Sequence, residues 1–126
     1  MNSVPAARIL VIEDDSSVLS MLQEMLENAG YEVVPATNGE EGLQKYRDSH
    51  VNLVITDILM PKKDGIETIR ELRKTSSKAK IIAITGTRGS YNRLPAASYV
   101  GAQRTLLKPF TKEDILTAIE EVLNEN

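Results

Sequence analysis

Five short runs of apolar residues alternate along this 126-residue chain with longer stretches in which apolar and charged residues recur at helical spacing. Such alternation of strand-length and helix-length patterns predicts an α/β fold with a parallel sheet. Three of the runs are nearly continuous in Val, Ile and Leu, which is typical of strands covered on both faces. The expected strands are Arg8–Ile12, Glu32–Ala36, Leu53–Asp57, Ile81–Thr85 and Thr105–Lys108.

The stretches between these runs carry signals for helix starts and helix ends. Ser16 can cap a helix that continues to about Asn28, and Gly30 would end it. Thr111 and Asp114 form a capping-box pattern at the start of the last helix. The remaining helices are expected at about Asn38–Asp48, Gly65–Lys74 and Thr111–Asn124, with a short one from Pro95 to about Val100.

Length and composition narrow the class of protein. One domain is expected over residues 8–126, after a disordered lead-in at residues 1–7. A formal net charge of −3 gives no sign of a surface for nucleic acid or anionic membrane. The sequence has no cysteine, which excludes disulfides and thiolate metal sites, and its first residues lack the features of a secretory signal. A cytoplasmic location, without direct contact with nucleic acid or membrane, is therefore expected.

Polar residues stand at the ends of four of the predicted strands. Asp14 follows the first run, with Glu13 before it, Asp57 and Thr85 close the third and fourth runs, and Lys108 closes the fifth. Because parallel strands end at the same edge of a sheet, these side chains are expected to gather at the carboxyl edge, where open α/β sheets bind ligands. Carboxylates, a hydroxyl and an ammonium on one rim suit a divalent cation together with a phosphoryl group.

The carboxylates predict a magnesium site, because clustered carboxylates repel each other unless a cation or a proton compensates. Asp14 and Asp57 are the expected direct ligands, Glu13 is expected to reach the ion through water, and the backbone carbonyl of Leu59 could complete the set. Mn²⁺ is expected to substitute for Mg²⁺. The neighbouring Asp15 is instead expected to stabilise the start of the first helix.

Asp57 is also the expected nucleophile toward phosphorus, which would make it an aspartyl-phosphate. An exposed turn is expected over the site, because Met60-Pro61 and Asp64-Gly65 follow this residue. Phosphoryl transfer depends mostly on positioning and on charge stabilisation. Lys108 would supply the cation and Thr85 the hydroxyl.

These motifs resemble the receiver domain of two-component response regulators, over roughly residues 8–123. The matching segments are Glu13-Asp14-Asp15, Gly30-Tyr31-Glu32-Val33, Asn38-Gly39-Glu40-Glu41-Gly42, Ile55-Thr56-Asp57-Ile58-Leu59-Met60-Pro61, Asp64-Gly65, Thr85-Gly86 and Lys108-Pro109-Phe110. The resemblance is to the stand-alone type, like the chemotaxis regulator. It implies a flavodoxin-like, doubly wound (βα)5 fold, with a five-stranded parallel sheet of order 2-1-3-4-5 and helices on both faces.

The resemblance also implies a function, that of a phosphoryl-accepting switch in a two-component or phosphorelay system. Asp57 would be the phosphoacceptor, Glu13 and Asp14 the acidic pair, and Thr85 and Lys108 the groups that contact the phosphoryl oxygens. A histidine kinase or a histidine phosphotransfer protein would be the donor. The domain would catalyse only its own phosphorylation and slow dephosphorylation. The peptide bond after Lys108 is expected to be cis.

Two features depart from the family pattern. Thr105 occupies the switch position that is commonly Tyr or Phe, so a ring cannot swing inward there. The segment between Thr85 and Lys108 is about one residue longer than usual. The response is expected at the surface formed by the Pro95–Val100 helix, the last strand and the last helix, where an unknown downstream protein would bind. A monomer or a weak phosphorylation-dependent dimer is expected.

Two other classes of function are compatible with part of this sequence pattern. A phosphatase of the haloacid-dehalogenase type would also use a nucleophilic aspartate and magnesium, but its second aspartate would fall on Leu59. An interaction domain that works without phosphorylation is the other alternative, favoured only by Thr105. Because the sequence ends soon after its last predicted helix, we expect either a stand-alone regulator or a receiver cut from a longer protein.

Overall fold

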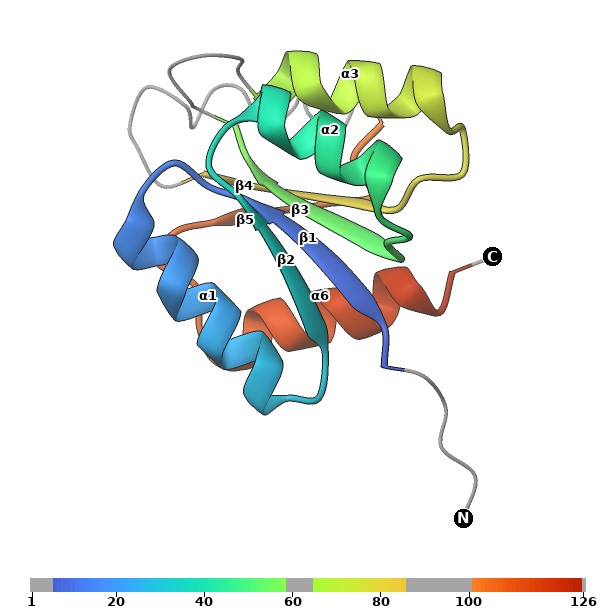
Figure 1. The fold of residues 1–126 in the computed structure, drawn as a ribbon. Helices are drawn as coiled ribbons and strands as arrows, with labels where there is room; N and C mark the ends of the chain where they lie inside the picture. Colours follow the sequence, from blue (N-terminus) through green and yellow to red (C-terminus); the bar gives the residue numbers. More distant parts are fainter. Residues whose placement is uncertain (1–5, 59–64, 86–100, 126) are drawn as a thin grey trace.

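A computed structural model of the chain describes residues 6–58, 65–85 and 101–125, with only the backbone described for the last residue of the fourth strand. Figure 1 shows the elements in chain order. They are β1 (Arg8–Ile12), α1 (Ser16–Asn28), β2 (Glu32–Ala36), α2 (Gly39–Asp48), β3 (Leu53–Asp57), α3 (Gly65–Thr75), β4 (Ile81–Thr85), β5 (Arg104–Leu107) and α6 (Lys112–Leu123).

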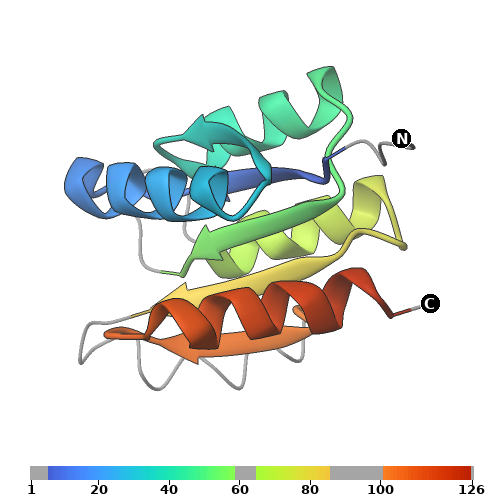
Figure 2. The ribbon, with the colours of Figure 1, turned by 90° about the horizontal axis from the view of Figure 1, so that it is seen from below.

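The strands form one five-stranded sheet in the order β2-β1-β3-β4-β5, and every neighbouring pair is parallel. Helices α1 and α6 cover one face of this sheet, and α2 and α3 cover the other (Figures 1 and 2). The predicted flavodoxin-like architecture and strand order are confirmed. Among the described residues there are four helices, and the helix expected at Pro95–Val100 lies outside them.

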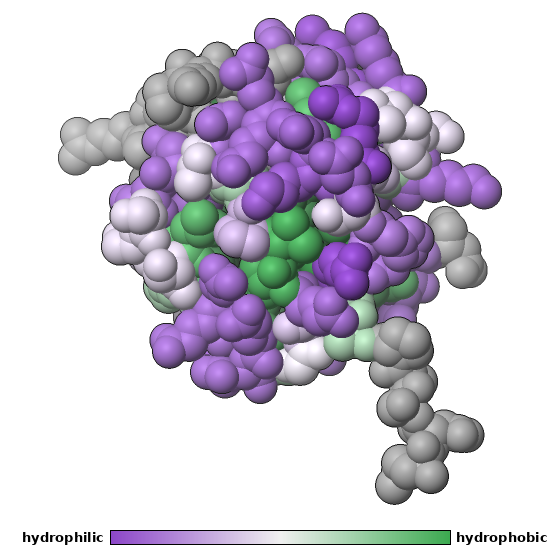
Figure 3. Space-filling model, in the orientation of Figure 1, coloured by the Kyte–Doolittle hydropathy of each residue, from purple (hydrophilic) through white to green (hydrophobic). Residues whose placement is uncertain are grey.

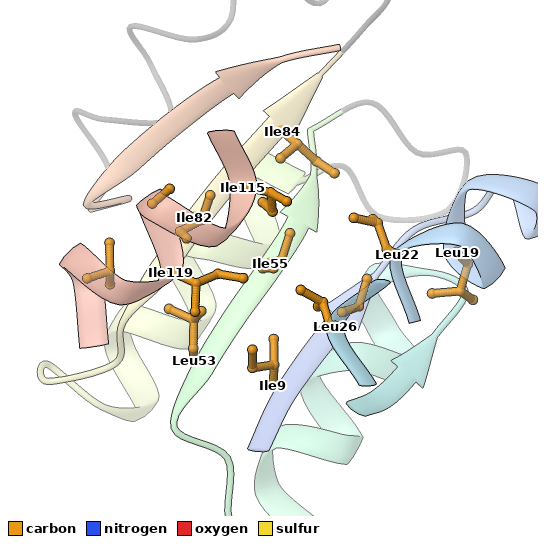
Figure 4. Packing of buried hydrophobic residues seen from close by; sticks show 13 residues of the cluster. Ile9, Leu19, Leu22, Leu26, Leu53, Ile55, Ile82, Ile84, Ile115 and Ile119 are labelled. Carbon is orange, nitrogen blue, oxygen red and sulfur yellow. The ribbon is translucent and has the colours of Figure 1, made fainter. Parts of the chain in front are cut away.

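Each face of the sheet has its own hydrophobic core, which explains the unbroken apolar runs. Along β1, the fully buried Ile9 and Val11 pack in the layer with α1 and α6, whereas Leu10 and Ile12 pack in the layer with α2 and α3. Figure 4 shows the first of these layers, in which side chains of α1 and α6 converge on β1, β3 and β4. Burial of apolar surface on both sides fixes each strand in the sheet.

Helix α1 begins one residue earlier than Ser16 suggested. Its cap is Asp15, which has extended backbone angles and whose carboxylate accepts hydrogen bonds from the backbone N–H groups of Ser17 and Val18. The prediction of Ser16 as the cap was therefore wrong, and the expected role of Asp15 at the helix start is confirmed. A carboxylate is the better cap here because it also interacts favourably with the helix dipole.

The other helix ends follow the predicted signals. Gly30 has a φ of 99°, and its N–H donates to the carbonyl of Glu27 while Tyr31 N–H donates to Leu26, which is the Schellman arrangement. Thr111 and Asp114 form the capping box of α6. Helix α3 extends one residue past the expected end, to Thr75.

The last strand is shifted by one residue from the predicted Thr105–Lys108. It begins at Arg104, which pairs with Ile82 of β4, and it ends at Leu107. Hydropathy misplaces this strand because its first residue is charged. The Arg104 guanidinium reaches Glu125 of the chain end at 2.8 Å and Glu121 of α6 at 3.6 Å, so it lies outside the apolar run while its backbone belongs to the sheet.

Strand β2 forms an edge of the sheet whose outward row of backbone donors and acceptors is interrupted at Pro35. Figure 3 shows an apolar strip on this face, and Val33 and Val34 of β2 are both partly exposed. The backbone groups of Glu32 and Ala36 point to β1, so those of Val33 and Pro35 point outward. Pro35 has no N–H to donate, and its carbonyl already accepts a hydrogen bond from Lys45 Nζ of α2 at 3.0 Å.

No helix of the described residues is long and apolar enough to span a membrane.

Candidate functional site

The structure brings together the side chains that the sequence placed at strand ends. Glu13 and Asp14 follow β1 directly, Asp57 is the last residue of β3, and Lys108 follows β5 directly. All four lie at the carboxyl edge of the sheet. Thr85 ends β4 beside Leu107, so its backbone is at the same edge. Its side chain is not among the described parts of the structure.

Lys108 links the two buried carboxylates. Its Nζ lies 2.8 Å from Glu13 Oε1, where it donates a hydrogen bond, and 3.6 Å from Asp57 Oδ2. The Glu13 side chain is 1% exposed, that of Asp57 is 9% exposed and that of Lys108 is 22% exposed. The ammonium is therefore held between two buried carboxylates, on a side chain that is itself partly exposed to solvent. The Lys108-Pro109 peptide bond is cis, as predicted.

Three carboxylates converge closely enough to share one cation. Each of Glu13, Asp14 and Asp57 offers an oxygen, and these atoms all lie within 4.8 Å of one another. Asp14 is exposed and the other two are buried, so an ion could enter from the solvent side. Oxygen donors at this spacing fit Mg²⁺, which takes one or two carboxylates and keeps several waters. Leu59, whose carbonyl was expected to assist, lies outside the described residues.

Among the described residues, the site places three carboxylates around one ammonium, that of Lys108, so the carboxylates outnumber the cation. Burial, and then the neighbouring charge of Asp57, raise the pKa of Glu13 to about 7, although hydrogen bonds from Lys108 and the Asp15 N–H oppose this shift. Burial alone would lower the pKa of Lys108, but its hydrogen bond to Glu13 and the charge of Asp57 outweigh burial and raise this pKa. A second cation would relieve the remaining repulsion.

The close packing of Gly65, at the start of α3, against the backbone of Asp57 was not predicted from the sequence. A Cβ on Gly65 would lie 2.2 Å from the Asp57 carbonyl oxygen and 2.6 Å from Ile58 Cα, so only glycine lets α3 begin this close to β3. Gly65 N–H also donates to the Ile58 carbonyl at 2.6 Å. The position of glycine at the start of the predicted α3 was a usable signal, because an interior contact with backbone tolerates no side chain.

Comparison with known proteins identifies the family. The response regulator receiver domain family matches residues 9–120. This chain belongs to that family. Receiver domains act in signalling as switches and not as enzymes that turn over a separate substrate.

Relatives of two kinds are similar to this receiver domain. Chemotaxis protein CheY of Bacillus subtilis is 34% identical over 120 residues, which cover 94% of this chain and 99% of that protein. Alkaline phosphatase synthesis transcriptional regulatory protein PhoP of the same organism is 30% identical over 119 residues, covering 94% of this chain but 49% of that protein. The chain thus spans about half the length of such transcriptional regulators and nearly the whole length of CheY.

Solved structures agree with the fold. A response regulator receiver domain protein from Clostridium thermocellum has a TM-score of 0.89 at 36% identity, with 94% of both chains covered. The response regulator protein TrrA from Thermotoga maritima, in complex with Mg²⁺–BeF, has a TM-score of 0.83 at 34% identity, covering 92% of this chain and 98% of that one.

Proposed function

We propose that this receiver domain is a phosphoryl-accepting switch in which Asp57 takes a phosphoryl group from a phosphohistidine. The observation that carries the proposal is the position of Lys108, whose ammonium lies 3.6 Å from Asp57 Oδ2, in a site where oxygens of three carboxylates lie within 4.8 Å of one another. A lone buried aspartate could serve only to end a strand. A buried aspartate that lies beside an ammonium and shares its site with two further carboxylates, which could hold a second cation, is suited to receive a phosphoryl group.

The transfer is a nucleophilic displacement at phosphorus. A carboxylate oxygen of Asp57 forms the new P–O bond while the P–N bond to the donor imidazole breaks, and the imidazole nitrogen keeps the electron pair and later binds a proton. Lys108 neutralises negative charge on the phosphoryl oxygens through a charge-assisted hydrogen bond. We assign the Thr85 hydroxyl to a second phosphoryl oxygen, on the basis of its place at the end of β4.

Glu13, Asp14 and Asp57 would hold Mg²⁺, or Mn²⁺ in its place. When bound, the ion would add positive charge beside the carboxylate of Asp57. The spacing of the three carboxylates supports this assignment, because one oxygen from each lies within 4.8 Å of the others and clustered carboxylates repel each other unless a cation or a proton compensates. We include the Leu59 carbonyl in the proposed ligand set from the sequence alone.

We further propose that the donor is a histidine kinase or a histidine phosphotransfer protein, that the exchange takes place in the cytoplasm, and that residues 8–126 act as one domain. The response would leave through the surface that includes β5, α6 and residues 95–100. Thr105 lies in β5 at the usual aromatic position, so this response would involve backbone movement near Thr85 and not the swing of a ring.

Phosphorylation of the purified protein tests the proposal. With Mg²⁺ and acetyl phosphate, intact mass should show one phosphoryl adduct on the wild type and none on Asp57→Asn. Peptide mapping that places the adduct on Asp14 or Asp15 would refute the assignment of Asp57. Absence of any adduct on the folded wild type would favour an interaction domain that works without phosphorylation.

A further inference from the structure

A group of hydrogen bonds joins the last turn of α3 to the segment that enters β5. Arg73 Nη1 donates to the carbonyl of Ser77 at 2.9 Å and to that of Ala79. Arg73 Nη2 donates to the carbonyl of Gly101 and approaches Gln103 Oε1 at 3.4 Å. The planar guanidinium can serve these acceptors at once because its five N–H donors have a fixed geometry.

The segment before β5 is shaped to receive this guanidinium. Gly101 has a φ of 124°, and a Cβ at this position would lie 2.8 Å from Arg73 Nε, so the guanidinium lies directly against the glycine backbone. The Gln103 side chain completes the arrangement, since its Oε1 accepts from Ile81 N–H at 2.8 Å and its Nε2 donates to the Ala79 carbonyl at 3.2 Å. We call Arg73, Gly101 and Gln103 the β5 clamp.

The β5 clamp acts on a strand that has few other constraints. β5 has four residues and, within the part of the chain that the structure describes, pairs with β4 alone, so its register depends on one ladder. Its other ion pairs, from Arg104 to Glu121 and Glu125, involve side chains that are 39–56% exposed and are therefore weak. The clamp is part-buried and joins the starts of both β4 and β5 to one guanidinium.

We propose that Arg73 is a positioning residue for Lys108, and that it acts by holding β5 in register with β4. This inference rests on the proposed function, because it concerns how Lys108 is placed over Asp57. Helix α3 connects the two: its first residue, Gly65, packs on the Asp57 backbone, and its last turn holds the entrance to β5. Helix α3 therefore contacts both the backbone of Asp57 and the segment that leads through β5 to Lys108, and so fixes their relative positions. A displacement of about 1 Å at a reacting group can cost about a hundredfold.

The test compares Arg73→Met with Arg70→Met, which removes an exposed arginine one turn earlier on α3 that takes no part in the clamp. Binding of Mg²⁺ alone, and of beryllofluoride at saturating Mg²⁺, is followed by amide NMR. We expect Arg73→Met to weaken beryllofluoride binding by about tenfold. Its Mg²⁺ affinity should change by less than about twofold, because Glu13 and Asp14 follow β1 and Asp57 ends β3, none of which the clamp contacts. Arg70→Met should change neither.

A double-mutant cycle with Lys108→Ala separates positioning from general damage, because couplings appear only between residues that act together. In the Lys108→Ala background, Arg73→Met should have no further effect on beryllofluoride binding. An equal loss in both backgrounds, an equal loss of Mg²⁺ affinity, or no loss at all would overturn the proposal. If Arg73→Met fails to fold, Arg73→Lys replaces it, because lysine keeps the charge but lacks the planar guanidinium. Arg73→Lys must then weaken beryllofluoride binding, by less than tenfold, and leave Mg²⁺ affinity unchanged.

A readout in metal-free protein keeps the two proposals distinguishable. The ¹⁵Nζ resonance of Lys108 reports its hydrogen bond to Glu13 without any phosphoryl mimic. If the wild type binds no beryllofluoride, the proposed function fails, and a shifted Lys108 signal in Arg73→Met would still support the clamp. An unchanged Lys108 signal in Arg73→Met would refute the clamp, whether or not beryllofluoride binds.

Discussion

Replacing Lys108 by Met in the metal-free receiver should destabilise it by an amount that grows with pH. At an effective dielectric constant of about 20, its charge interacts by about 6 kcal/mol with Glu13 at 2.8 Å and by about 5 kcal/mol with Asp57 at 3.6 Å. Desolvation of the three groups offsets most of this energy. The remaining cost of Lys108→Met is also limited, because Glu13 can bind a proton when its partner is removed.

The free energy of protonating Glu13 therefore sets the size of the pH-dependent loss of stability in Lys108→Met. The pKa of Glu13 in the folded wild type is about 7, above the ordinary value of 4.5, so this group stabilises the fold most below pH 4.5 and the contribution is lost as pH rises to about 7. Protonating it in the variant then costs about 1.4 kcal/mol at pH 8 and about 2.7 kcal/mol at pH 9. Loss of the weaker Asp57 contact adds about 1 kcal/mol at every pH.

Urea unfolding followed by far-UV circular dichroism, in buffer with EDTA, measures these differences. We expect Lys108→Met to lower the free energy of unfolding by about 1 kcal/mol at pH 5.5, about 2.5 at pH 8 and about 3.5–4 at pH 9. The exposed Lys112→Met should change it by less than about 0.5 kcal/mol at each pH. A loss that is the same at pH 5.5 and pH 9 would show that Lys108 does not compensate Glu13.

Three other substitutions give separate tests. Asp14→Asn should abolish most of the stabilisation by Mg²⁺, which is about 2.7 kcal/mol at 100 times the dissociation constant; an unchanged thermal shift would contradict the metal assignment. Gly65→Ala should cost about 2–3 kcal/mol in urea unfolding, because the new methyl meets the backbone of Asp57, and a wild-type midpoint would argue against that contact. Asn38→Ala should cost about 1 kcal/mol through loss of the cap on Glu41 N–H, with the urea slope unchanged.

The sequence predicted the fold and the meeting of site residues because both depend on local patterns. Val, Ile and Leu runs define the strands, and a polar residue at the end of a parallel strand must lie at the carboxyl edge. Where a residue serves two purposes, the pattern misleads. Arg104 is charged yet begins β5, and Asp15 caps α1 although a serine follows it.

Other features depend on contacts between distant residues and could not be read from the sequence. The Glu13–Lys108 hydrogen bond joins residues 95 positions apart, and nothing in either local segment favours it over a contact of Lys108 with Asp57 or Asp14. Arg73 is the same case, since an arginine in the last turn of a helix is ordinarily explained by the helix dipole. Its four acceptors come from segments whose arrangement only the tertiary structure defines.

The interruption of the β2 edge at Pro35 limits how this receiver can bind other proteins along that strand. An extended peptide that adds to a sheet edge needs an alternating row of free donors and acceptors. At β2 that row is interrupted, because Pro35 offers no N–H and Lys45 already occupies its carbonyl. Recruitment of a partner strand, and stacking of receiver on receiver into fibrils, are both disfavoured along this side, so we expect a protein that binds here to recognise side chains, such as the partly exposed Val33 and Val34, and not the backbone.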